Sequence, residues 1–161
     1  VDPAHGEIGF AISHLVISKV KGLFESYDAN LVLDAEGKLV SAEATIQVDT
    51  INTRNKDRDD HLKNEDFFAA DKFPTITFKS KSVSEEAIVA DFTIRDVTKE
   101  ITLPYELKGP VDDPWGNTKL GFSATIDINR RDYGMTYGKP AILGDTVHIT
   151  IDTEFAKQKT E

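Results

Sequence analysis

Residues 120–129 read LGFSATIDIN, the most regular alternation of apolar with polar or small residues in the chain. Successive side chains of a β-strand point to opposite faces of a sheet, so this period of two predicts a strand with one apolar face. The same period recurs along the chain. The segments that show it are residues 7–14, 23–33, 38–50, 74–79, 88–95, 101–107 and 147–151. The sequence therefore predicts an all-β fold of eight strands.

The links between these strands indicate how they are arranged. Most are short, like the Asp-x-x-Gly turn at residues 34–37, which predicts antiparallel neighbours in an up-and-down order. A sheet with one apolar face can bury that face by closing on itself. We therefore expect a single domain over residues 1–161, folded as an eight-stranded antiparallel up-and-down barrel. A two-layer sandwich is the alternative, because periodicity does not distinguish the two.

One segment, residues 52–78, interrupts the alternation. It begins with several potential capping residues and continues with charged helix formers through Lys63, which predicts a short helix between the third and fourth strands. The strongly apolar residues in and just after this helix are Leu62, Phe67 and Phe68. We expect this segment, called the lid below, to lie on the surface with its apolar edge over the barrel.

An up-and-down order places the links after the first, third, fifth and seventh strands at one end of the barrel. These links are residues 15–21, the lid, residues 96–99 and residues 130–145, which makes this end the candidate mouth. The polar and aromatic residues expected at the mouth, besides those of the lid's apolar edge, are His14, Arg58, His61, Arg130, Asp132 and Tyr133. We expect an Arg-Asp pair among them to pin the lid and the last loop, in preference to contacting a ligand head group.

The inward-facing positions of the predicted strands provide a candidate lining for a ligand-binding lumen. They are Phe10, Ile12, Phe24, Ala42, Ala44, Ile46, Ile76, Phe78, Phe92, Ile94, Leu103, Phe122, Ala124, Ile126 and Ile149. Small and large residues are mixed in this set. A barrel of this size therefore either fills with side chains or encloses one apolar ligand, and both outcomes stay open at this point.

Composition and motifs argue against several classes of function. The formal net charge of −9 should repel a phosphate backbone, so nucleic acid is not an expected partner. No apolar run approaches the ~18 residues of a transmembrane helix, and the absence of cysteine rules out thiolate catalysis. The four histidines lack the spacing of a zinc motif and no nucleophile elbow is present, so neither a metal site nor a catalytic site is expected.

Four stretches taken together resemble successive signatures of the YceI-like family of lipid-binding proteins. They are residues 1–31, 51–80, 91–103 and 121–134, and the most specific parts are Arg58-Asp59-Asp60-His61-Leu62, Phe67-Phe68, Phe73-Pro74 and Asn129-Arg130-Arg131-Asp132-Tyr133-Gly134. The resemblance implies an extended, lipocalin-like eight-stranded barrel. It also implies a bound polyisoprenoid, isoprenoid quinone or fatty amide, and a role that is not chiefly enzymatic. Phe92 stands where the family usually has leucine, which would narrow or shorten the lumen.

The expected function is non-catalytic binding of a long-chain apolar lipid, for carriage, storage or sensing. One alternative is a lipid- or quinone-linked enzyme that uses His14 or His61 as a base, and another is a secreted interaction module with a filled barrel. The start at Val1 and the family resemblance favour a periplasmic or secreted protein, with a cytoplasmic one as the alternative. A homodimer is compatible with the sequence. Residues 157–161 are expected to fray.

Overall fold

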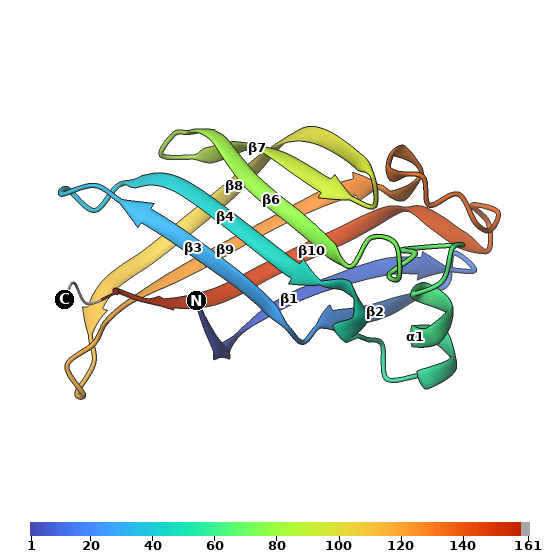
Figure 1. The fold of residues 1–161 in the computed structure, drawn as a ribbon, viewed down its shortest axis with the longest axis horizontal. Helices are drawn as coiled ribbons and strands as arrows, with labels where there is room; N and C mark the ends of the chain where they lie inside the picture. The colour runs from blue at the N-terminus through green and yellow to red at the C-terminus, as the bar shows by residue number, and fades with distance from the viewer. Residues whose placement is uncertain (159–161) are drawn as a thin grey trace.

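Ten β-strands and one short α-helix make up residues 1–158, the part of the chain that the computed structural model describes (Figure 1). The elements in chain order are β1 (Asp2–His14), β2 (Ser18–Phe24), β3 (Tyr27–Leu33), β4 (Leu39–Gln47), η1 (Val48–Thr50), β5 (Ile51–Asn52), α1 (Lys56–Leu62), β6 (Thr75–Val83), β7 (Ala87–Ile94), β8 (Val97–Asp112), β9 (Thr118–Asn129), η2 (Arg130–Tyr133) and β10 (Leu143–Ala156). The two η elements are 3-10 helices. The all-β prediction is confirmed.

The strands form one antiparallel sheet in the order β3-β4-β6-β7-β8-β9-β10-β1-β2-β5. Chain neighbours are therefore mostly sheet neighbours, as an up-and-down meander requires. The sheet curls along its length around a common interior, with α1 at one end and the last residues of β10 at the other (Figure 1). The antiparallel, lipocalin-like architecture is confirmed.

The predicted count of eight strands is wrong, because two long strands are each broken into two. The predicted strand 23–33 breaks at Glu25-Ser26, between β2 and β3, and the predicted strand 38–50 ends in η1 before β5. The two breaks lie side by side: Glu25 donates its backbone N–H to the carbonyl of Thr50 (3.2 Å), and Gln47 donates to the carbonyl of Ser26 (3.0 Å). At these breaks β2 pairs with β5 and β3 pairs with β4, so the two ends of the curled sheet meet there.

Several predicted loops are shorter than expected. The link at residues 15–21 is a hairpin loop of residues 15–17, because Ser18 already pairs with His14. β8 begins at Val97 and continues to Asp112, through a register shift between Lys108 and Val111. Lys157, expected to fray, donates its N–H to the carbonyl of Thr118 at 2.8 Å. Residues 159–161 of the same expectation lie outside the described part.

The lid helix α1 is shorter than the capped, charged segment suggested. Its N-cap is Asn55, whose side chain accepts a hydrogen bond from the backbone N–H of Arg58 at 3.0 Å. Asp57 and Asp59 in its first turn stabilise the helix N-terminus. None of its residues is fully buried. Within residues 1–158, no helix is both long enough and apolar enough to cross a bilayer.

Candidate functional site

An apolar cavity occupies the interior of the curled sheet. Its volume is about 170 Å³, and only three of its lining residues, Glu43, Arg130 and Thr153, have a polar side chain. Eight of the nine phenylalanines of the chain line it. The cavity reaches from the lid residue Phe68 at one end to Phe155 in the opposite half of the molecule, so it follows the length of the strands.

Strand geometry explains why the wall is so uniformly apolar. Alternate residues of paired strands point to the same face, so whole cross-strand pairs turn inward together. On β1 and β10 the inward pairs are Ile8 with Ile151, Phe10 with Ile149, and Ile12 with Val147. All six of these residues line the cavity. The period of two in the sequence thus becomes the continuous apolar wall of the lumen.

The structure places nearly all of the expected lumen residues at this wall. The exceptions are Ala124 and Ile126 on β9. Ala124 is buried in the core of the far half, where its larger neighbours Phe122 and Ile151 form the wall instead, and Ile126 is only partly buried. These two positions are thus outside the wall of the cavity. Ligand contact by the expected lumen residues stays a prediction.

Sequence reasoning missed two kinds of lining residue. The first kind follows the same strand parity and could have been included; it comprises Ile8, Ala29, Leu31, Ile128, Val147, Ile151 and Phe155. The second kind consists of Met135, between η2 and β10, and Leu143, the first residue of β10. No periodic signal marks Met135, which lies outside the strands, and Leu143 precedes the predicted last strand, which starts only at residue 147.

The apolar edge of the lid closes one end of the cavity. Leu62, Phe67 and Phe68 all line it, and the ring of Phe68 packs edge-on against Phe24 with centroids 5.9 Å apart. Phe67 contacts the ring of Tyr137 from the segment after η2, at 5.4 Å. Side chains from the lid and from the loop before β10 therefore meet over the lumen.

Polar residues of the lid mostly bind within the lid itself. Arg58 donates through Nε to the hydroxyl of Thr53 (2.8 Å) and through Nη2 to the Thr53 carbonyl (2.6 Å). Asp59 accepts hydrogen bonds from the N–H (2.9 Å) and the hydroxyl (2.6 Å) of the same residue. Thr53 is buried directly after β5, so α1 is anchored next to the sheet there. His61 lies 2.9 Å from Asp66, and its ring packs against Phe67.

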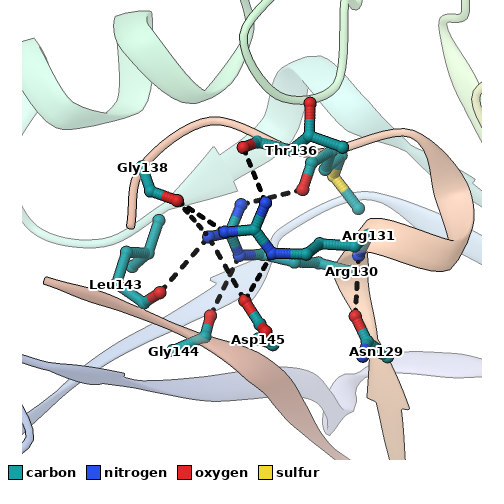
Figure 2. Close-up of polar contacts among 9 residues, drawn as sticks. Asn129, Arg130, Arg131, Thr136, Gly138, Leu143, Gly144 and Asp145 are labelled. Carbon is teal, nitrogen blue, oxygen red and sulfur yellow. Dashed lines mark hydrogen bonds and ion pairs between the residues drawn. The ribbon is translucent and has the colours of Figure 1, made fainter. Parts of the chain in front are cut away.

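Two consecutive arginines organise the segment between η2 and β10 (Figure 2). Arg130 is only 2% exposed and donates to the carbonyls of Met135 (2.8 Å), Leu143 (3.2 Å) and Gly144 (2.9 Å). Burial lowers the pKa of Arg130, as does the adjacent Arg131. These contacts direct the guanidinium at the backbone, so Arg130 holds the loop in place at the lid end of the cavity.

The acidic partner of this arginine pair is Asp145. Arg131 donates through Nε to its carboxylate at 2.6 Å, and Nη2 of Arg130 lies 3.8 Å from it. The expected pairing with Asp132 is wrong: Asp132 is exposed in η2, and the ion pairs of both arginines are with Asp145. The segment between η2 and β10 folds back, so that Asp145 near the start of β10 lies beside the arginines. Asp132, although nearer in sequence, does not pair with them.

Two other expected mouth residues lie in opposite environments. His14 is exposed rather than inward-facing: it is the last residue of β1, next to the exposed hairpin loop, although its β10 partner Leu143 lines the cavity. Tyr133 is 2% exposed and packs edge-on against Phe92 at 5.8 Å. Burial, with a contribution from Asp132, raises the pKa of Tyr133. Tyr133 therefore packs against Phe92, a residue of the cavity wall.

A group of possible metal ligands lies outside the lining of the cavity. The side chains of Asp2, His5 and Glu154 approach within 4.8 Å of one another. However, Nζ of Lys119 lies 3.3 Å from Asp2 and 3.5 Å from Glu154, so a cation already neutralises the carboxylates. The His5 hydrogen bond, with the N–H of Ala4 and Lys119, lowers the pKa of Asp2 to about 2. We assign the group to an ion-pair network at the chain start.

Comparison with known proteins decides the family. Residues 1–155 match the YceI-like domain. The chain belongs to the YceI-like family. A UPF0312 protein of Staphylococcus aureus is 40% identical over 162 residues, which cover 96% of this chain and 95% of that protein. A crystal structure of a Campylobacter jejuni YceI protein is 34% identical, with a TM-score of 0.82 over 99% of this chain and 97% of that one. The resemblance found in the sequence is confirmed.

A more distant relative of the YceI-like fold is described as a polyisoprenoid binding domain, from Saccharophagus degradans. It superposes with a TM-score of 0.76 over 95% of this chain and 94% of that one, at 12% sequence identity. At this identity the likeness shows the fold alone.

Proposed function

We propose that this YceI-like protein binds the apolar chain of a lipid, a polyisoprenoid or an isoprenoid quinone, inside the lumen without changing it chemically. The observation that carries the proposal is the cavity, whose wall is almost entirely apolar and rich in phenylalanine. A filled barrel that only displays its loops would not need such a cavity. The description of the Saccharophagus degradans domain as polyisoprenoid-binding supports this ligand class.

The size of the cavity sets how the ligand fits. A volume of about 170 Å³ is close to that of an apolar cavity of ~150 Å³ that binds benzene, so the unloaded lumen holds about one isoprene unit. A longer chain requires side chains to move. Phe24 contacts both Phe10 and Phe68 at the lid end, with ring centroids 5.8 and 5.9 Å away, and we propose that an entering chain displaces this cluster.

Burial of the chain supplies the affinity. Fifteen buried carbons contribute roughly 12 kcal/mol at about 0.8 kcal/mol each, against an association cost of ~4–15 kcal/mol. Three isoprene units therefore bring binding into a favourable range, and each further unit adds to it. Because the donors of Arg130 are directed at backbone carbonyls, we propose that the polar head group stays outside the lumen at the lid end.

Native mass spectrometry tests this proposal. Protein purified without detergent and incubated with octaprenol should gain the mass of one octaprenol per chain, and an excess of isoprenoid quinone should displace it. Several adducts whose number rises with octaprenol concentration would indicate surface adsorption. A bare polypeptide mass before and after incubation would overturn the proposal.

A further inference from the structure

Four apolar side chains are exposed together at the lid end of the molecule. Leu15, Val16 and Ile17 form the hairpin loop between β1 and β2 and are 48%, 77% and 86% exposed. Ile142, in the segment before β10, is 51% exposed, and its carbonyl accepts the N–H of Leu15 at 2.9 Å. We call these four residues the apolar tip. In Figure 1 the hairpin loop and this segment lie at the same end as α1.

The apolar residues of the hairpin loop are unusual for its backbone conformation. Leu15 and Val16 have φ values of +52° and +64°, a left-handed conformation in which Asn and Gly are favoured and a β-branched residue is an outlier. The loop thus keeps apolar side chains at positions whose backbone favours other residues. Departures of this kind from local preference are expected at functional sites.

The apolar tip is continuous with the wall of the cavity. Leu143, which follows Ile142, lines the cavity and pairs with His14, the last residue before the loop. A surface that contacts the tip therefore also lies beside the lid end of the lumen. Exposed Lys19 and Lys21 follow the tip on β2 and place positive charge next to it.

We propose that the apolar tip inserts into the surface of a lipid bilayer and docks the protein there with its lid end facing the membrane. A convex tip of four side chains suits insertion between lipids, with the two lysines at the level of the phosphates. It is much smaller than the ~800 Å² per partner that a stable dimer buries, which disfavours a second copy as the occupant. The purpose of docking rests on the proposed function, because the apolar ligands named there reside in bilayers.

The substitution Leu15→Asn/Val16→Gly separates the apolar surface from the fold. Asn-Gly favours positive φ at both positions, so the variant should keep or raise the melting temperature while losing two apolar side chains. Its affinity for phosphatidylcholine vesicles, measured by co-sedimentation, should fall roughly tenfold or more. The control is Trp115→Ser, which removes an 81% exposed side chain from the turn between β8 and β9. This turn lies at the end of the two strands opposite the lid, so the control should leave vesicle affinity unchanged.

Three results would overturn the docking proposal. They are no sedimentation of the unmodified protein with vesicles, equal affinities of the unmodified protein and the tip variant, and a loss of affinity in Trp115→Ser as large as in the tip variant. Octaprenol uptake measured without vesicles keeps this test apart from the proposed function. Uptake without vesicle binding refutes docking alone, and vesicle binding without uptake refutes the lumen ligand alone.

Discussion

A larger side chain on the lumen wall should weaken lipid binding without lowering the stability of the fold. Ala44 on β4 lines the cavity opposite Phe78 of β6, and its neighbour Thr45 has the opposite strand parity. Ala44→Phe adds six carbons to a cavity of about 170 Å³. These carbons occupy the space of about one isoprene unit. Burial of the five carbons of that unit contributes roughly 4 kcal/mol to the binding free energy, at about 0.8 kcal/mol each, and its loss corresponds to a nearly thousandfold lower affinity. Because a flexible chain can shift along the lumen, we expect a loss of at least tenfold.

The same substitution should have the opposite effect on the empty protein. Filling an existing cavity stabilises a fold, whereas overpacking costs about 1–3 kcal/mol. We therefore expect Ala44→Phe to keep or raise the melting temperature without ligand while lowering octaprenol binding, measured by native mass spectrometry. Thr45→Phe makes a similar addition on the outer face and should leave binding unchanged. Equal binding by the two variants, or a loss of binding together with a loss of stability in Ala44→Phe, would refute the reasoning.

Three further predictions concern the lumen width, the arginine and the chain start. Phe92→Leu should widen the lumen, which should increase the preference for longer over shorter polyprenols in competition assays; an unchanged preference would show that Phe92 does not limit length. Arg130→Met should lower the free energy of unfolding in urea by roughly 3 kcal/mol, because buried carbonyls lose their donor, whereas exposed Asp132→Ala should change it by less than about 0.5 kcal/mol. The lowered pKa of Asp2, about 2 against 3.8, means that its contribution to stability is complete above pH 3.8 and is lost as the pH falls toward 2. His5→Ala should raise this pKa toward 3.8 in an NMR titration, and an unchanged value would assign the shift to the N–H of Ala4 and Lys119 instead.

Strand faces were predictable because the two-residue period of a strand is independent of its partners. Alternation alone predicts Phe10 and Ile149 at the lumen, and they do pair across β1 and β10. The same rule fails at the end of a strand. His14 continues the apolar parity in sequence, but it is the last residue of β1, next to the exposed hairpin loop, and is itself exposed.

Features that depend on contacts between distant segments were not predictable. The strand breaks near Ser26 and Thr50 stabilise each other through backbone hydrogen bonds, so neither segment alone signals a break. Asp145 replaces Asp132 as the partner of the arginines because the intervening loop folds back on itself. The sequence predicts a longer link at residues 15–21, because the residue types of the loop at residues 15–17 do not favour its hairpin conformation.

The most direct test of a lipid in the lumen is a crystal structure of the protein loaded with octaprenol. We expect continuous, tube-shaped electron density between Phe68 at the lid and Phe155 in the far half, with the rings of Phe10, Phe24 and Phe68 moved from their positions in the empty protein. A lumen that keeps its empty volume, with octaprenol ordered only on the outer surface, would contradict the account.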